Sequence, residues 1–209
     1  MDFLSDTFTS GGFGLLSAHS PDVGGAWTLD AGSGNDMFVA SGQCSMTGGG
    51  AVGYTNSAAP PWADFSASVG MHGDPGVSNQ QSIRIRKYAA AGNRYEAKFI
   101  PPNVLQLNKV LAGATTTLDS TTISLPDLSS PPATIEISAT GSALAVKVNG
   151  APTLSATDAS ITAAGLVGLD GVRSVGQPLY LDNLHAVGAA VTLVRRGMFE
   201  RAGVRGSAG

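Results

Sequence analysis

Phe3-Leu4-Ser5-Asp6-Thr7-Phe8-Thr9 opens the chain as an alternating strand, and Pro178-Leu179-Tyr180-Leu181-Asp182-Asn183-Leu184-His185-Ala186 matches it about 175 residues later. No linker-like composition separates the two stretches. We therefore expect one domain over residues 1–187, followed by a basic C-terminal arm over residues 188–209. The N-terminus carries acidic residues and lacks the basic start and apolar core of a signal peptide, so none is expected.

Short runs with a period of two residues recur between these stretches, as is typical of antiparallel strands with one buried face. The clearest run places Ile83 and Ile85 on one face of a strand, together with the stem of Lys87. Arg84 and Arg86 are expected on the other face.

Turn signals separate the runs. Asn149-Gly150 is the strongest of them, and it predicts a tight hairpin between strands at 143–148 and 152–156. One helical turn is expected near residues 160–164. About a dozen short strands without alternating helices predict an all-β antiparallel sandwich of two sheets.

The composition agrees with this fold and narrows the classes of partner. The 209 residues include 28 glycines, only 13% are charged, and the single cysteine, Cys44, excludes an internal disulfide and is expected to be buried. The net charge is −3, with +3 in the segment from Arg195 onward and −6 before it. An acidic body disfavours nucleic acid as a ligand, and no apolar run is long enough to insert into a membrane.

Several short landmarks follow one another along the predicted strands. They are Asp6-Thr7-Phe8, Leu15 to Trp27, Ile83-Arg84-Ile85-Arg86, Tyr95-Glu96-Ala97, Val146 to Gly150, Gly165 to Leu169 and Tyr180 to Leu184. Their order resembles that of the concanavalin A-like (laminin-G-like) jelly-roll sandwiches. A shorter stretch, His19-Ser20-Pro21-Asp22-Val23-Gly24-Gly25-Ala26-Trp27, looks like a segment of jelly-roll domains in bacteriophage and prophage structural proteins. The resemblance implies that the first and last strands lie side by side and that Trp27 fills an edge of the core.

Members of the family that cleave β-glucans carry a Glu-x-Asp-x-x-Glu strand, because retaining hydrolysis needs two carboxylates about 5–5.5 Å apart. The three glutamates here, Glu96, Glu136 and Glu200, have no carboxylate two or four residues away. The three histidines lack the spacing of metal ligands, and there is no nucleophile elbow or phosphate loop. We expect no enzyme and no catalytic residue. A glycoside hydrolase with carboxylates from different strands stays a remote alternative.

No cofactor is required by this reading, but the resemblance implies a structural calcium ion as an option. Calcium takes six to eight oxygen ligands, and Asp6, Asp182 and Asn183 would supply them at the paired termini. Asp22 and Asp30 are weaker candidates. The alternative is that Asp6 and Asp182 accept hydrogen bonds from nearby backbone groups.

Glycan binding would need exposed aromatic rings and groups that bond sugar hydroxyls. Trp62 is the best platform because it follows a proline-rich loop, and Tyr54, Arg86 and Tyr88 are expected to complete the face. The alternative for Trp62 is a plug at the end of the core.

The arm differs from the body in composition. Its apolar and basic side chains predict a docking peptide, since apolar anchors fill pockets and arginines bind carboxylates. Pairing with an identical subunit and a disordered tail are the alternatives. The docking residues would be Arg195, Arg196, Met198, Phe199, Arg201 and Val204.

Together these observations favour a non-enzymatic virion component of a bacteriophage: a capsid decoration protein, a head fibre or a part of the tail. Its partners would be other virion proteins or copies of itself, and a host surface glycan would be a further ligand. It would be assembled in the host cytoplasm and located in the virion. The alternative is a lectin-like, receptor-binding module.

Overall fold

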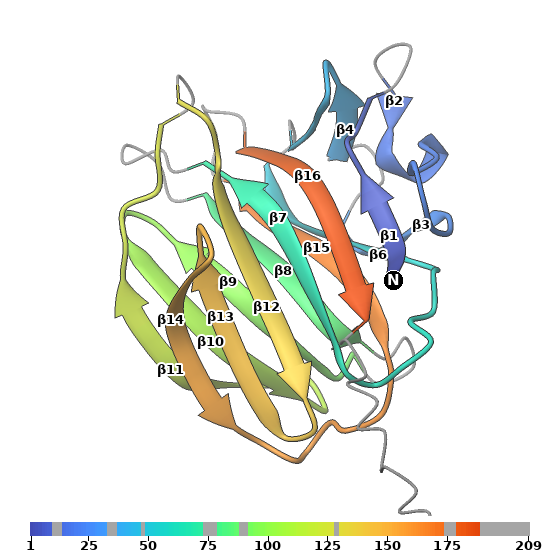
Figure 1. Cartoon of the computed structure of the whole chain (residues 1–209). Helices are drawn as coiled ribbons and strands as arrows, with labels where there is room; N and C mark the ends of the chain where they lie inside the picture. The colour runs from blue at the N-terminus through green and yellow to red at the C-terminus, as the bar shows by residue number, and fades with distance from the viewer. Residues whose placement is uncertain are drawn as a thin grey trace, which may run out of the picture.

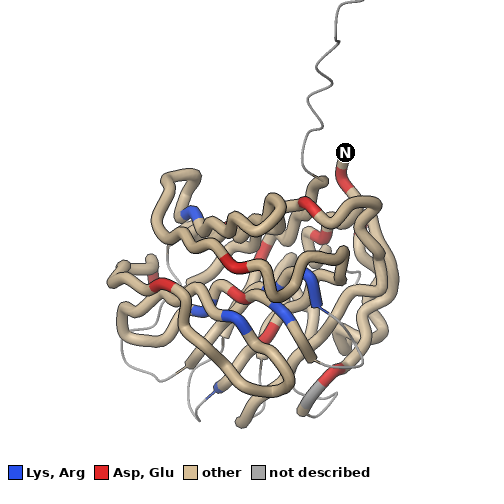
Figure 2. Tube along the Cα trace, turned by 90° about the horizontal axis from the view of Figure 1, so that it is seen from below, with Lys and Arg blue, Asp and Glu red and all other residues tan. Residues whose placement is uncertain are grey.

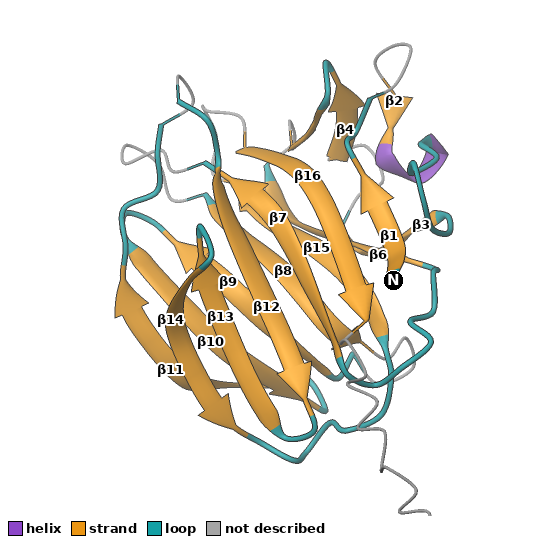
Figure 3. Ribbon diagram, viewed as in Figure 1, coloured by secondary structure: helices purple, strands orange, loops and turns teal. Residues whose placement is uncertain are grey.

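A computed structural model describes residues 1–9, 14–32, 37–46, 49–72, 79–87, 92–127, 130–173 and 179–188. They form two antiparallel sheets packed face to face (Figures 1 and 3), which confirms the predicted all-β sandwich. The helical element η1 (Leu16–Ala18) is a single short turn. The turn expected near residues 160–164 is instead a loop, so that prediction was wrong.

The first sheet has nine strands, with β1 added beside β16. Its path is β14-β13-β12-β7-β16-β5-β4-β2. The bounds are β1 (Asp2–Asp6), β2 (Gly14–Leu15), β4 (Met37–Ala40), β5 (Gln43–Met46), β7 (Phe65–Met71), β12 (Ala133–Thr140), β13 (Ala143–Val148), β14 (Ala151–Thr157) and β16 (Leu179–Gly188).

The second sheet has seven strands in the order β11-β10-β9-β8-β15-β6-β3. The bounds are β3 (Trp27–Ala31), β6 (Gly50–Asn56), β8 (Gln80–Lys87), β9 (Arg94–Ile100), β10 (Val104–Leu111), β11 (Ala114–Thr122) and β15 (Leu166–Arg173). Of the eight lysines and arginines in the described residues, seven lie on this sheet. Figure 2 shows this concentration of basic residues in one layer.

The two ends of the described domain are paired, as the resemblance implied. β1 runs antiparallel to β16, with Leu4 opposite Ala186 and Asp6 opposite Leu184. All four side chains are buried. Because β16 also pairs with β7, the opening and closing strands become part of one continuous sheet. β16 ends at Gly188, and residues 189–209 lie outside the described residues, so the arm stays a prediction.

The core lies between the sheets and contains the inward side chains of nearly every strand. Trp27, at the start of β3, is buried beside Phe8, which confirms its expected place at the core edge. Cys44 is buried and free of disulfide bonds, as expected, and burial raises the pKa of its thiol. Burial of a large apolar side chain stabilises such a core by about 1.5–3 kcal/mol.

The strand β8 departs from its predicted alternation at Arg86. This residue has a positive φ of 49°, and the pairing between β8 and β15 shifts register between Leu166 and Gly168. Such a bulge changes which face the following residue occupies. Lys87 therefore joins Arg84, with which it shares the partner Asp30.

No helix long and apolar enough to cross a membrane occurs in the described part of the chain.

Candidate functional site

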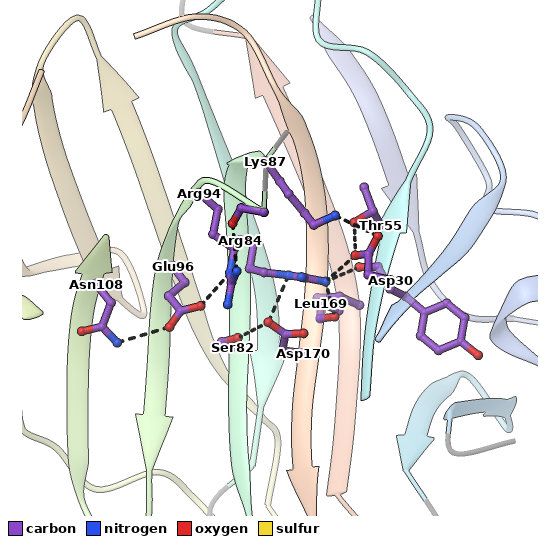
Figure 4. A network of polar contacts seen from close by, with 12 residues as sticks. Asp30, Thr55, Ser82, Arg84, Lys87, Arg94, Glu96, Asn108, Leu169 and Asp170 are labelled. Atoms are coloured by element: carbon purple, nitrogen blue, oxygen red, sulfur yellow. Dashed lines mark hydrogen bonds and ion pairs between the residues drawn. The ribbon is translucent and has the colours of Figure 1, made fainter. Parts of the chain in front are cut away.

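The side of the seven-stranded sheet that faces away from the core carries a continuous band of polar side chains. We call this band the polar face; its residues are Asp30, Thr55, Ser82, Arg84, Lys87, Arg94, Glu96, Lys98, Gln106, Asn108 and Asp170. Strand register aligns it, because Asn108 lies opposite Glu96, Glu96 opposite Arg84, and Arg84 opposite Gly168. Figure 4 shows the side chains bridging these neighbouring strands.

Arg84 is the centre of the polar face. Its Nη2 donates to the carbonyl oxygens of Tyr54 at 2.7 Å and Leu169 at 2.9 Å, and to Asp30 Oδ2 at 3.1 Å. Its Nε lies 3.2 Å from Asp170 Oδ2. Only 3% of the side chain is exposed, so the guanidinium depends on these partners for the interactions that water would otherwise supply.

Two glycines make room for this arrangement. A Cβ at Gly168 would lie 2.9 Å from both Nε and Nη2 of Arg84. A Cβ at Gly53 would collide with Asp170 Oδ1 and lie 3.2 Å from Arg84 Nη2. Both glycines occupy strand positions from which a side chain would point outward. Because glycine has no side chain, Arg84 can lie across β15 and β6 at these positions.

The remaining charges on the polar face are paired around Arg84. Lys87 Nζ lies 2.8 Å from Asp30 Oδ1, and the Thr55 hydroxyl donates to the same carboxylate. Glu96 accepts from Arg94 Nε at 3.0 Å and from Asn108 Nδ2 at 3.3 Å. The carboxylates are therefore fixed in direction before any ligand arrives.

Two features of this network point to an incomplete set of partners. The pKa of Asp170 is raised, because the effect of burial, which raises it, is larger than the effect of the Arg84 guanidinium, which lowers it. Asn108 Oδ1 is buried and has no hydrogen-bond partner among the described residues. Buried polar atoms normally have partners, so such an atom is notable at a surface that could receive a ligand.

A pocket of about 170 Å³ opens on the polar face and is lined in part by Asp170, the ion-pair partner of Arg84. Its charged lining residues are Arg94, Lys98 and Asp170, and Ser82 and Gln80 add hydrogen-bonding groups. The rest of the lining is Ala51, Gln81, Gly171 and Val172. The pocket thus combines fixed charges with a small apolar wall, as sites for small polar ligands do.

A second, larger pocket of about 300 Å³ lies near β2 and β4 and is lined by Thr9, Gly14, Leu15, Ala18, His19, Ser20 and Val39. Of the described residues that line it, only His19 is ionisable, and His19 is already hydrogen-bonded to Asp6. The smaller pocket therefore has the richer chemistry, despite its size.

The four residues predicted for glycan binding do not form one surface. Tyr54 is fully buried, so it cannot stack on a sugar, and that prediction was wrong. Tyr88 lies outside the described residues. Trp62 is 39% exposed, but its ring covers Gly188 at the end of β16, in the nine-stranded sheet. It thus lies against the other sheet from Arg84.

The prediction for Arg86 was also wrong, because the bulge turns its side chain inward. It is fully buried and donates to the carbonyl oxygens of Ala63, Gly141 and Ile161. It also pairs with Asp64 at 3.0 Å. Since these partners belong to loops of both sheets, Arg86 ties the end of the sandwich together.

Asp6, the first of the predicted calcium ligands, is already surrounded by hydrogen-bond donors. Asp6 is buried and accepts from the Phe8 amide and His19 Nε2 at 2.8 Å, and from Trp27 Nε1 at 2.9 Å. A carboxylate only accepts, so His19 Nε2 carries the proton. Three N–H donors occupy the oxygens that a cation would need, which favours the alternative that Asp6 is a structural acceptor.

The other proposed calcium ligands have separate surroundings. Asp22 accepts from the amide and hydroxyl of Thr7, and these bonds lower the pKa of Asp22. Asp30 belongs to the polar face, while burial raises the pKa of Asp182 on β16, beside Asn183. Among the described residues, no group of three or more His, Cys, Asp or Glu side chains could hold a metal ion.

Sequence reasoning missed most of the polar face, including Glu96, Lys98, Asn108 and Asp170. A signal was present, since Ser82 and Arg84, Glu96 and Lys98, and Gln106 and Asn108 each occupy alternate positions of a strand. What the pattern lacks is the register that sets these pairs opposite one another.

No family model matches this chain, and no curated protein matches it. Solved structures do resemble it. One is a prokaryotic β-1,3-1,4-glucanase (lichenase) derived from a mouse hindgut metagenome, with a TM-score of 0.61 and 10% identity, covering 88% of this chain and 98% of that one. Another is the carbohydrate-binding module CBM66 from Bacillus subtilis, with a TM-score of 0.58, 15% identity and coverages of 75% and 91%.

A third is a Bacillus subtilis protein of unknown function with a galectin-like fold, with a TM-score of 0.57, 11% identity and coverages of 78% and 89%. At these identities the likeness shows the fold alone, and that fold is the concanavalin A-like jelly roll that the landmarks predicted. Nothing in these comparisons ties the domain to phage structural proteins.

Proposed function

We propose that the protein binds an oligosaccharide on the polar face, without cleaving it. The observation that carries this proposal is the band of fixed charged and amide side chains beside the 170 Å³ pocket. Sugar hydroxyls are bound by convergent donors and acceptors in a shallow depression, and this surface offers both.

The rigidity of the polar face supports the proposal. Arg84 holds its position through two carbonyl oxygens and two carboxylates, so its neighbours are oriented before a ligand binds. Binding to a prearranged surface costs less conformational entropy than binding to mobile side chains. Two of the similar folds are a carbohydrate-binding module and a glucanase, which adds support by analogy only.

Binding without hydrolysis is proposed because the carboxylates are already engaged. Glu96 pairs with Arg94 at 3.0 Å. Asp30 and Asp170 both pair with Arg84, at 3.1 and 3.2 Å. Hydrolysis needs one carboxyl group as the acid and a second as the nucleophile or base, and carboxylates held by guanidinium groups are not free for these roles. An inverting hydrolase, whose two carboxyl groups lie about 6.5–9.5 Å apart, is the alternative that the test must exclude.

The test is a screen of immobilised glycans with the full-length protein, followed by calorimetry and an assay for newly released reducing ends. We expect glycan binding without release of reducing ends. Gln80→Trp, at the start of β8, would fill the pocket and reduce the affinity. The matched control is Lys147→Gln. Lys147 lies on β13 of the nine-stranded sheet, where it pairs with Glu136 of the same sheet, so this variant should bind the glycan as the wild type does. Absence of binding, or equal binding by Gln80→Trp, would contradict the proposed site.

A virion role for this domain is a second proposal, and it rests on the resemblance of the stretch from His19 to Trp27. His19 and Trp27 both donate hydrogen bonds to Asp6, so their contribution to the fold is enough to explain why these two residues are present. The proposed docking residues of the arm, from Arg195 to Val204, lie outside the described residues. Light scattering of the full chain and of Phe199→Asp tests it: an oligomer that the substitution dissociates would support assembly through the arm, and a wild-type monomer would count against self-assembly.

A further inference from the structure

We propose that the glycan bound on the polar face is acidic, and that its carboxylate or sulfate group binds at Lys98 and Arg94 in the pocket. This inference rests on the proposed function and specifies its class of ligand. It follows from an imbalance of charge in the pocket.

Lys98 is the source of that imbalance. Its neighbours directly across the strands, Ser82 on β8 and Gln106 on β10, are both uncharged. Within the described part of the chain, Lys98 has no acidic partner. By contrast, Lys87, Lys109 and Lys147 pair with carboxylates at 2.8, 2.6 and 2.9 Å.

The other charges of the pocket are compensated. Asp170 faces Arg84 Nε at 3.2 Å and the Ser82 hydroxyl at 3.5 Å. Arg94 pairs with Glu96 at 3.0 Å while 22% of its side chain stays exposed. Lys98 therefore leaves the pocket with an excess positive charge, on a protein whose net charge is −3.

An oxyanion suits this position for geometric reasons. Lys98 is half-buried, so a carboxylate or sulfate beside it would form a charge-assisted hydrogen bond that is partly shielded from water. Arg94 and Ser82 line the same pocket and offer further donors. The pocket is smaller than the roughly 300–1,000 Å³ of sites for drug-sized ligands, so it would hold a single substituted ring. The rest of the oligosaccharide would lie along the polar face.

The experiment compares three probes by calorimetry with the full-length protein. They are an oligosaccharide of uronic acids, the same oligosaccharide after reduction of its carboxyl groups to neutral hydroxymethyl groups, and a sulfated neutral oligosaccharide. We expect at least one anionic probe to bind about tenfold to a hundredfold more tightly than the neutral probe, the range for a charge-assisted bond. The tighter anionic probe identifies the oxyanion. Raising the salt concentration should reduce the difference.

Lys98→Gln tests the residue itself, with Lys147→Gln as its matched control. We expect Lys98→Gln to lose most of the preference for the anionic probe, Lys98→Glu to lose more, and the control to keep it. Lys98 has no ion pair within the described residues, so the midpoint of urea unfolding of Lys98→Gln should equal that of the wild type. This measurement separates a loss of binding from a loss of folding.

The outcomes distinguish this inference from the proposed function. Equal binding of the neutral and anionic probes would overturn the acidic ligand, and an unchanged preference in Lys98→Gln would overturn the placement of the anion at Lys98. Both results would leave glycan binding intact. If neither the three probes nor the glycan screen gives binding, both proposals fail.

Discussion

Replacing Gly53 by alanine tests the packing that builds the polar face. The new Cβ would collide with Asp170 Oδ1 and approach Arg84 Nη2 to 3.2 Å, while no backbone atom is among its three nearest neighbours. Asp170 must then move away from Arg84. The contact that weakens is an ion pair, and interactions between residues in one ion-pair network are worth about 0.5–3 kcal/mol. Alanine in a strand gains about 0.5–1 kcal/mol over glycine, so we expect a net destabilisation of up to about 2 kcal/mol.

The assay is urea unfolding of four proteins: the wild type, Gly53→Ala, Asp170→Ala and the double variant. If the collision with Asp170 is the cause, Gly53→Ala should be neutral or slightly stabilising once Asp170 is shortened. The coupling between the two positions should then fall within the roughly 0.5–3 kcal/mol seen for residues in contact. Gly14→Ala is the matched control, since a Cβ there meets nothing within 4 Å. Additive effects of the two substitutions would refute the reasoning.

Three further predictions concern the rest of the fold. Trp27→Phe removes the indole N–H from the buried carboxylate of Asp6, and urea unfolding should show a loss of about 1–3 kcal/mol; a smaller loss would mean that this bond is not needed. Although burial would raise the pKa of Asp158, hydrogen bonds from Lys109, Tyr95 and Ser160 hold it well below its ordinary value of 3.8. The stability that Asp158 supplies is therefore complete above about pH 4 and lost as the pH falls further, so the stability difference between wild type and Asp158→Asn should shrink in acid; a constant difference would contradict this. Cys44 should react with a thiol reagent only after unfolding, because it is buried and its pKa is raised; rapid labelling of the native protein would be inconsistent with the structure.

Features encoded by a few neighbouring residues could be predicted from the sequence. Asn149 and Gly150 have positive φ values of 51° and 80°, as a two-residue hairpin turn requires, and they join β13 to β14. The alternation of Ile83 and Ile85 correctly indicated a strand with one face in the core. These features can be predicted because they depend only on local backbone geometry and on which face of a strand is buried.

The polar face could not be predicted in the same way, because it depends on cross-strand register. Arg84 meets Glu96 from one neighbouring strand and Asp170 from the other, residues 12 and 86 positions away in the sequence. The bulge at Arg86 had no sequence signal that we recognised, and it exchanged the expected faces of Arg86 and Lys87. Glycine at position 168 is informative only once Arg84 is known to lie over it.

The aromatic residues that we expected at a glycan site and that the structure describes lie away from the polar face or are buried. Tyr54 contributes its backbone carbonyl oxygen to Arg84, whereas its ring is buried in the core. Trp62 covers Gly188 at the end of β16. Only 6% of the residues are aromatic, and six of the ten aromatic side chains in the described ranges are buried in the core. The ligand chemistry that we propose depends on charged and amide groups instead.

The most direct test of glycan binding on the polar face is to map it by NMR. Backbone amide shifts of the isotope-labelled protein would be followed while the tightest glycan from the screen is added. We predict that the largest changes occur on β8, β9 and β15, around Ser82, Lys98 and Asp170. Changes centred on Trp62 and β16 instead, or no saturable change at any residue, would contradict the account.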